Sequence, residues 1–170
     1  NGKRLIEYAI DTLKDLCSEI LISSNASCYD YLGYNVVPDI IPNIGPMGGI
    51  YSCLLRSSGQ CNMVLSCDMP FTDSRIFTEL YKFKNDSLIC IPAHNDQFYE
   101  PLCGIYMKDV VPEMEEFILM NNFKLPDLFK KTKFRPFLYR EHMPGIDESY
   151  FMSINSPGDL KKACELIKGR

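Results

Sequence analysis

The clearest indication of the fold lies in residues 63–71, which read MVLSCDMPF. The first five residues of this stretch form a short, nearly continuous apolar run, which is typical of a strand covered on both faces. Asp68 follows the run directly, and Pro70 then prevents the strand from continuing. We therefore predict a buried strand over residues 63–67 that ends in a carboxylate.

Short apolar runs of this kind alternate with helical patterns along the rest of the chain. The expected strands cover residues 19–23, 35–38, 63–67, 87–92, 102–106, 137–139 and 151–154. The expected helices cover residues 4–16, 47–56, 74–84, 111–120 and 125–131, with a last helix that Ser156, Pro157 and Asp159 begin. This alternation predicts an α/β fold of three layers, with a doubly wound, mostly parallel, Rossmann-like sheet and an antiparallel hairpin in residues 92–106.

The composition is that of an ordinary globular protein and argues against several classes of function. The 170 residues are 46% hydrophobic and 24% charged, which fits a single domain. The 18 basic and 22 acidic residues give a net charge of −4, so we expect no nucleic-acid partner. Apolar runs fall short of the ~20 residues of a membrane span, so we expect no membrane association. The eight cysteines form no CxxC pair and several lie in apolar runs, which predicts a reducing, cytoplasmic location.

Polar or glycine-rich residues follow four of the predicted strands. They are Ser23 with Asn25, then Asp39 with the loop of residues 45–49, then Asp68, and finally Asn155. Ligands of doubly wound sheets bind beyond the carboxyl ends of the strands. These residues therefore predict a binding site along one edge of the sheet.

Asp68 is the strongest candidate for chemistry. A carboxylate at the tip of a buried strand can hold Mg²⁺, which takes one or two protein carboxylates and fills its octahedron with phosphate oxygens and water. The alternative is that Asp68 caps the following helix, although Thr72, Asp73 and Ser74 lie nearer to that helix.

The other candidates each have a structural alternative. Asp39 is expected to accept from a sugar hydroxyl or to join the metal shell, or else it is a turn residue. Ser23 and Asn25 are expected to bind a base or ribose, or else to cap a helix. Glycines in the loop of residues 45–49 allow a flat ligand to approach the backbone, but a tight turn before a helix has the same composition. Glu100 and Asn155 are expected to contact a second substrate, or else to serve as an edge-strand turn and a cap.

Six segments, taken together, resemble the molybdenum cofactor guanylyltransferases, within the wider nucleotide-diphospho-sugar transferase-like fold. They are ILISSN (20–25), VVPD (36–39), IGPMGGI (44–50), VLSCDMPF (64–71), EPLCGIY (100–106) and MSINSPGDL (152–160). The resemblance runs from about Asn1 to Leu160. It implies a Mg²⁺-dependent enzyme that transfers GMP from GTP to molybdopterin or its molybdenum form, releases pyrophosphate, and works with molybdoenzyme-maturation proteins.

The resemblance also implies roles for individual residues. Asp68 matches the metal-binding aspartate of the family, and Asp39 matches its nucleotide-contacting aspartate. Asn155 matches an asparagine near the pterin pocket. Gly45, Pro46, Met47, Gly48 and Gly49 correspond to the family's guanine-reading PLAG element, with Met47 and Gly48 in place of Leu and Ala. Ser23 stands where the family often carries a nucleotide-binding Asn, a role that Asn25 is expected to take over.

One family element has no counterpart in the sequence. The family opens with a strand and a glycine-rich loop, LxGGxSxRMG, that holds the triphosphate, whereas Asn1-Gly2-Lys3 corresponds to the turn after them. We therefore expect residues 1–170 to be a single nucleotidyltransferase-like domain without its first strand and phosphate-binding loop. Two alternatives remain open: a cytidylyl- or sugar-nucleotidyltransferase of the same fold, and a non-catalytic nucleotide-binding domain.

Overall fold

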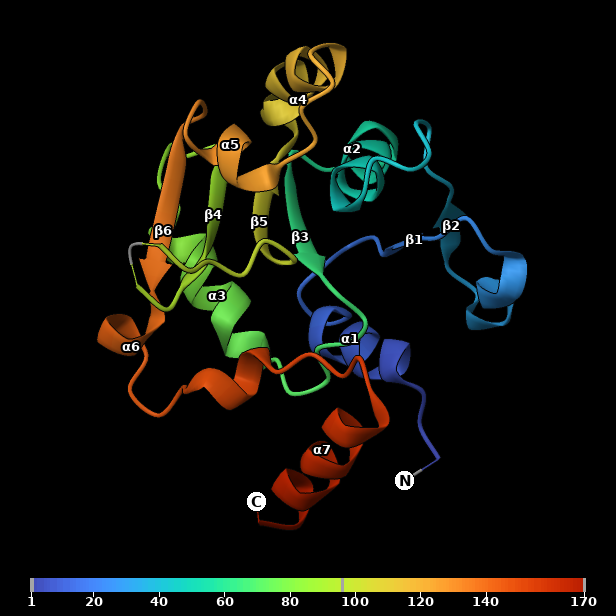
Figure 1. The fold of residues 1–170 in the computed structure, drawn as a ribbon, viewed down its shortest axis with the longest axis vertical. Helices are drawn as coiled ribbons and strands as arrows, with labels where there is room; N and C mark the ends of the chain where they lie inside the picture. Colours follow the sequence, from blue (N-terminus) through green and yellow to red (C-terminus); the bar gives the residue numbers. More distant parts are fainter. Residues whose placement is uncertain (1, 96, 170) are drawn as a thin grey trace.

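The computed structural model describes residues 2–95 and 97–169 of the chain, which form an α/β fold (Figure 1). The strands are β1 (Leu21–Ser23), β2 (Asn35–Val37), β3 (Cys61–Leu65), β4 (Ile89–Ala93), β5 (Cys103–Met107) and β6 (Phe134–Leu138). The α-helices are α1 (Leu5–Leu13), α2 (Pro46–Arg56), α3 (Ser74–Phe83), α4 (Val111–Leu119), α5 (Leu125–Phe129), α6 (Tyr139–His142) and α7 (Pro157–Gly169). Short 3₁₀ helices are η1 (Ser27–Leu32), η2 (Lys108–Val110) and η3 (Glu148–Phe151).

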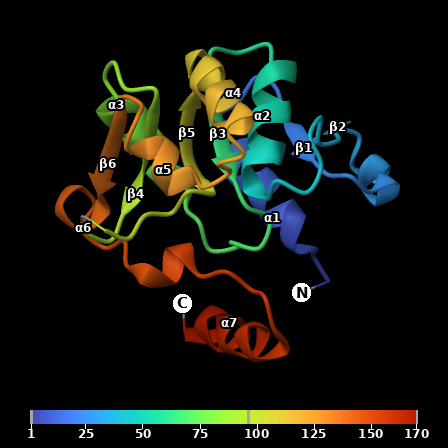
Figure 2. The same ribbon diagram turned by 45° about the horizontal axis from the view of Figure 1, so that its top comes forward.

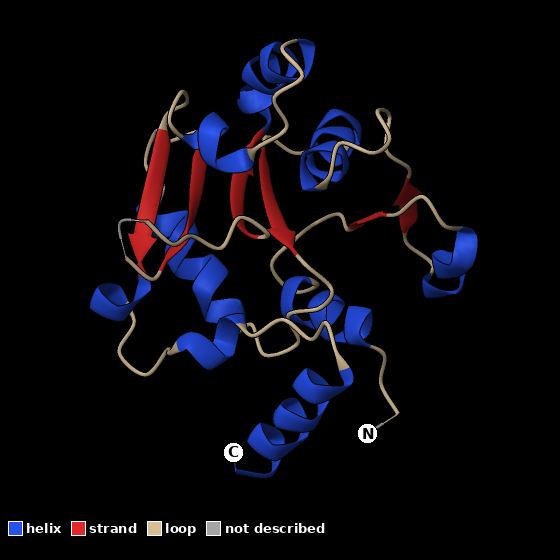
Figure 3. Ribbon diagram, viewed as in Figure 1, coloured by secondary structure: helices blue, strands red, loops and turns tan. Residues whose placement is uncertain are grey.

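The strands form two separate sheets, as Figure 3 shows. The larger sheet has the order β3-β5-β4-β6, and the smaller one pairs β1 with β2 in parallel. Strand β6 is parallel to β4, whereas β5 is antiparallel to both of its neighbours. Strands β3, β4 and β6 therefore point in one direction and share one carboxyl edge, as the sequence predicts.

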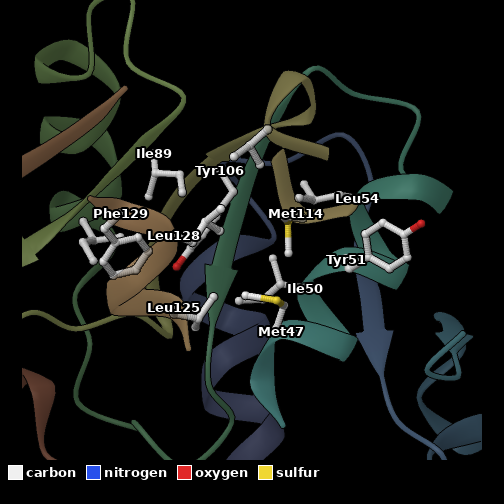
Figure 4. Close-up of a cluster of buried hydrophobic side chains, with 12 residues drawn as sticks. Met47, Ile50, Tyr51, Leu54, Ile89, Tyr106, Met114, Leu125, Leu128 and Phe129 are labelled. Carbon is white, nitrogen blue, oxygen red and sulfur yellow. The ribbon is translucent and has the colours of Figure 1, made fainter. Parts of the chain in front are cut away.

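Helices cover both faces of the larger sheet, which confirms the prediction of three layers (Figure 2). Successive residues of β4 alternate between the two apolar clusters. Ile89 and Ile91 pack with α2, α4 and α5, as the close-up in Figure 4 shows for Ile89. Cys90 instead packs with Ile76, Phe77 and Leu80 of α3. A strand buried on both faces requires apolar residues at every position, and this explains the unbroken apolar runs.

The antiparallel segment is confirmed, but the predicted strand over residues 151–154 is wrong. Within the described residues, η3 ends at Phe151 and the next three residues join no sheet. The Ile154 amide donates a hydrogen bond to the Asp68 carbonyl at 2.8 Å. The segment then turns into α7, where the Ser156 hydroxyl accepts from the Asp159 amide at 3.2 Å. Phe151 packs against His94 and Tyr139, the residues that follow β4 and β6, rather than along a neighbouring strand.

Candidate active site

Asn25 and Asp39 hold each other beyond the ends of the paired strands β1 and β2. The Asn25 side-chain amide donates to Oδ2 of Asp39 at 3.0 Å, and its carbonyl oxygen accepts from the Asp39 backbone amide at 2.7 Å. Two hydrogen bonds in opposite directions fix the orientation of both side chains. The Asp39 carboxylate is therefore held in place at the carboxyl edge of the small sheet before any ligand arrives.

The loop of residues 45–49 begins helix α2 beside this pair. Gly45 has a φ of 66°, which a glycine adopts without strain, and Pro46 occupies the first turn of the helix. Ser52 ties the helix to the loop that follows β2, since its hydroxyl accepts from the Ile40 amide at 2.8 Å and donates to the Gly48 carbonyl at 2.7 Å. The start of α2 is thus fixed against Asp39.

The five loop residues fall into two groups. Met47 is fully buried in the apolar cluster of α2, and a Cβ on Gly48 would meet the Ile41 carbonyl and the Ile44 side chain at 3.0 Å. These two residues therefore serve packing. Gly45, Pro46 and Gly49 instead line a cavity of about 390 Å³. A role of Met47 and Gly48 in binding remains a prediction. Because Met47 is buried and Gly48 has no room for a side chain, only their backbone groups would contact a ligand.

The cavity joins residues that lie far apart in the sequence. Ser23 and Asp39 line it from the small sheet, and Ser66 and Cys67 line it from the end of β3. Tyr29 of η1 adds an aromatic side chain, and burial raises the pKa of its hydroxyl. Ser23 and Asp39, which follow or end two different strands, therefore line the same cavity. Asp68 comes directly after Cys67, which also lines it.

The substitution Gly49→Ala tests how closely α2 packs against β1. A Cβ on Gly49 would overlap the Ser23 hydroxyl oxygen, while the Ser23 Cβ would lie at an ordinary 3.5 Å. Gly49→Ala should therefore lower the free energy of unfolding by about 1 kcal/mol. In a Ser23→Ala background the same change should instead stabilise by up to about 1 kcal/mol, because alanine favours the helix. Urea unfolding of the four proteins measures this; additive effects would contradict the contact.

Asp68 follows Ser66 and Cys67 and carries an unsatisfied oxygen. Its Oδ1 is buried and has no hydrogen-bond partner within the described residues. A buried carboxylate oxygen without a partner is costly, and a bound cation offsets that cost. The described residues hold no group of three or more His, Cys, Asp or Glu side chains that could bind a metal. The unpaired Asp68 oxygen is a donor of the kind that Mg²⁺ takes, since this ion needs only one or two protein carboxylates when phosphates and water supply the rest.

Asn155 lies near Asp68, because it follows the residue whose amide bonds the Asp68 carbonyl. Its side chain is exposed, and its backbone amide donates to Oδ2 of Asp159 at 3.3 Å. The structure therefore places Asn155 at the same edge as Asp68, while the hydroxyl of Ser156 caps the start of α7.

Glu100 lies farther along this edge, and it pairs with His94. Nε2 of His94 lies 2.5 Å from Oε1 of Glu100, and the Tyr139 hydroxyl lies 3.0 Å from Nδ1 of His94. Burial raises the pKa of the Tyr139 hydroxyl. Tyr139, which follows β6, thus contacts His94, which follows β4, and His94 in turn holds Glu100. Glu100 does not line the cavity beside the small sheet. His94 follows strand β4 directly, and this position is the sequence signal that identifies it as a candidate site residue.

A family model described as "MobA-like NTP transferase domain" matches residues 1–133. The chain belongs to this family. A protein of Clostridium perfringens strain 13 named "Probable molybdenum cofactor guanylyltransferase" is 33% identical over 167 residues, which cover 95% of this chain and 84% of that protein. A Vibrio vulnificus protein named "Molybdenum cofactor guanylyltransferase" is 30% identical over 98% of this chain and 84% of its own length. The resemblance inferred from the six segments is thereby confirmed.

Solved structures agree on the fold. The crystal structure of "Molybdopterin-guanine dinucleotide biosynthesis protein A" from Archaeoglobus fulgidus superposes with a TM-score of 0.80 at 23% identity, covering 99% of this chain and 88% of that one. A 2-C-methyl-D-erythritol 4-phosphate cytidylyltransferase from Thermus thermophilus gives 0.72 at 14% identity, covering 99% and 91%. Within the described residues, no helix of this family member is long and apolar enough to cross a membrane.

Proposed function

We propose that this protein is a molybdenum cofactor guanylyltransferase, which transfers GMP from GTP to molybdopterin or its molybdenum form and releases pyrophosphate. One observation carries the proposal: relatives with that name are 30–33% identical to this chain over nearly its whole length. The likeness to cytidylyltransferases, at 13–14% identity, concerns the fold alone. The proposal includes a cytoplasmic location and molybdoenzyme-maturation proteins as partners.

In this proposal, GTP occupies the cavity of about 390 Å³ beside the small sheet. Asp39 accepts hydrogen bonds from the ribose, since its carboxylate is already oriented by Asn25. Ser23 lies at the rim, and the exposed backbone at Gly45 and Pro46 is open to the edge of a flat base. The second substrate approaches along the sheet edge from the side of Glu100 and Asn155.

Asp68 would hold the magnesium ion in this site, since its buried Oδ1 lacks a partner within the described residues. A bound Mg²⁺ supplies positive charge that offsets the negative charge of the phosphates. The reaction needs little proton transfer, because the phosphate of the pterin is already ionised. Its oxygen attacks the α-phosphorus of GTP, a new P–O bond forms, and the bond to the bridging oxygen breaks so that pyrophosphate leaves with the electron pair. Positioning and electrostatic stabilisation carry most of the rate of such a transfer.

Nucleotide choice separates this proposal from a cytidylyltransferase of the same fold. We expect pyrophosphate release with molybdopterin to be at least about tenfold faster with GTP than with CTP or UTP, because a base-edge mismatch costs a hydrogen bond of about 1.4 kcal/mol or more. Measurement of pyrophosphate with each nucleotide in turn, using the product of the complete gene, tests this. A preference for CTP or UTP would defeat the guanine assignment, and nucleotide binding without turnover would favour a binding domain.

A further inference from the structure

Glu100 is the outer member of a hydrogen-bonded chain of three side chains at the carboxyl edge of the larger sheet. An ionised carboxylate can only accept, so Nε2 of His94 carries the hydrogen and donates it to Oε1 of Glu100 at 2.5 Å. In the neutral imidazole Nδ1 is then an acceptor, and the Tyr139 hydroxyl, 3.0 Å away, donates to it. Each bond orients the next group, so the direction of the Glu100 carboxylate is fixed.

Aromatic packing holds the His94 ring in the same position. Phe151 of η3 lies edge-on to His94, with 5.6 Å between the ring centroids, and its ring lies 4.8 Å from that of Tyr139. Tyr139 is fully buried, whereas the side chain of Glu100 remains 25% exposed. The chain of hydrogen bonds therefore begins inside the protein and ends in a carboxylate that a ligand can reach.

The Glu100 carboxylate keeps capacity for a ligand. Within the described part of the chain, His94 is the one side chain that bonds it, and this bond takes one lone pair of Oε1. The other oxygen and the second lone pair of Oε1 are left for further donors. A planar group with two adjacent N–H donors can therefore pair with both oxygens.

An exposed aromatic ring lies on the same face as this carboxylate. Tyr99 forms a β-bridge with Ala93, and its ring packs against Phe134 on one face of the sheet. Side chains alternate along an extended segment, so Phe98 and Glu100 project to the opposite face. Phe98 is 65% exposed. A large apolar ring beside a free carboxylate suits a flat heterocyclic ligand.

Asp68 lies between this group of residues and the nucleotide cavity. The Ser66 amide donates to the Leu102 carbonyl at 2.8 Å, so Asp68 and Glu100 each lie two residues from the same hydrogen bond. The cavity of about 390 Å³ lies on the side of β3 that faces β1, whereas Glu100 precedes β5, which pairs with the other side of β3. A ligand at Glu100 and a nucleotide in the cavity would therefore approach Asp68 from opposite sides.

The chain that follows η3 bounds the distance between the two places. Figure 1 shows this chain running along the carboxyl edge toward α7. It begins at Phe151, which packs against His94, and it reaches Ile154, whose amide donates to the Asp68 carbonyl at 2.8 Å. Phe151 and Ile154 are at most about 10 Å apart, because three residues of extended chain reach no farther. That span is comparable to the length of a fused-ring pterin with its phosphate.

We propose that Glu100 binds the amino-oxo-pyrimidine edge of the pterin in the second substrate, and that His94 and Tyr139 are positioning residues that aim its carboxylate. This inference rests on the proposed function. The pterin edge presents a ring N–H and the exocyclic amino group side by side, which are two donors for the two carboxylate oxygens. Phe98 supplies an apolar face for the ring, and the phosphate of the substrate extends toward Asp68.

Binding of two phosphorylated pteridines tests the inference without any transfer step. The probes are hydroxymethylpterin phosphate and hydroxymethyllumazine phosphate, in which an oxo group replaces the exocyclic amino group. The product of the complete gene is titrated with each probe, and the fluorescence of the pteridine is followed. We expect the pterin to bind at least about tenfold more tightly, because the lumazine turns a carbonyl oxygen toward the Glu100 carboxylate.

Substitution of the carboxylate should remove this preference. Glu100→Gln is expected to reduce it to about threefold or less, because the amide keeps one acceptor and loses the charge. The matched control is Glu116→Gln, which changes an exposed carboxylate of α4 and should leave the preference intact. Equal binding of the two pteridines by the unaltered protein, or an undiminished preference in Glu100→Gln, would overturn the inference.

The positioning role has its own variants. His94→Leu should weaken pterin binding by about fivefold and reduce the preference over lumazine, whereas His94→Gln keeps a donor near the place of Nε2 and should retain most of it. Tyr139→Phe removes only the hydroxyl and should cost about threefold, so it serves as the test if His94→Leu fails to fold. A merely structural role would lower the melting temperature but leave the ratio of the two affinities unchanged, and that result would contradict positioning.

Pyrophosphate release from GTP with molybdopterin separates this inference from the proposed function. A protein that transfers GMP but binds both pteridines equally would contradict the inference alone. A protein that prefers the pterin through Glu100 but transfers no GMP would contradict the proposed function alone.

Discussion

Asp68→Asn is expected to lower nucleotide transfer by at least on the order of 100-fold, which corresponds to about 2.7 kcal/mol. The substitution keeps the size of the side chain but removes the negative charge that would hold Mg²⁺ at the end of β3. The same change should leave stability unchanged or slightly raised, because Oδ1 of Asp68 is buried without a partner in the described residues. Steady-state kinetics of the complete gene product, with a melting curve, measure both effects.

Asp86→Asn is the matched control for this substitution. Asp86 is an exposed carboxylate whose Oδ2 lies 3.7 Å from Nζ of Lys133, so its loss should change neither activity nor stability measurably. Near-normal turnover of Asp68→Asn would remove Asp68 from the reaction. A large fall in its melting temperature would instead assign it a structural role.

Gly104→Ala is expected to destabilise the protein by about 3 kcal/mol, the largest effect on stability that we predict. Gly104 lies in β5, between β3 and β4. A Cβ there would overlap the Cγ2 methyl of Ile91 and would lie 3.0 Å from the Cys90 carbonyl oxygen. The methyl belongs to a fully buried branched side chain and the oxygen to the backbone of β4, so neither can move freely. Thermal unfolding should show a melting temperature lower by about 10 °C.

Gly59→Ala provides the comparison for Gly104→Ala. The nearest atoms to a Cβ at Gly59 are the Cys61 carbonyl oxygen at 3.7 Å and the Ser57 hydroxyl at 3.8 Å, which are ordinary contacts. Its effect should remain within about 0.5 kcal/mol. A similar, small effect at both glycines would show that β5 lies less tightly against β4 than the structure indicates.

Apolar periodicity predicted most of the fold because the sheet is buried on both faces. Strand β4 and helix α3 are clear in the sequence, since burial demands an apolar residue at each position of the strand and every third or fourth position of the helix. Residues 151–154 have the same apolar appearance, yet they join neither sheet of the described structure. Composition alone cannot distinguish a strand, whose backbone pairs with a neighbouring strand, from an extended segment that is buried only through its side chains.

The candidate site was predictable where a polar residue ends an apolar run, as at Asp39 and Asp68. What the sequence could not show is which of these residues hold each other. The Asn25–Asp39 pair joins residues that follow different strands, and so does the contact of the Tyr139 hydroxyl with His94, so both contacts depend on strand order. The division of the strands into two sheets is not visible in the sequence, because each strand by itself has the pattern of a fully buried one.

The place of β5 has a consequence for how the polypeptide acquires its structure. Because β5 lies between β3 and β4, the earlier strands cannot meet until residues 103–107 have been synthesised and inserted between them. Nascent chains shorter than this would expose the apolar edges of β3 and β4 during translation, when aggregation competes with folding. A central strand that arrives late also raises the average sequence separation of contacts, and slow refolding from denaturant is the expected result.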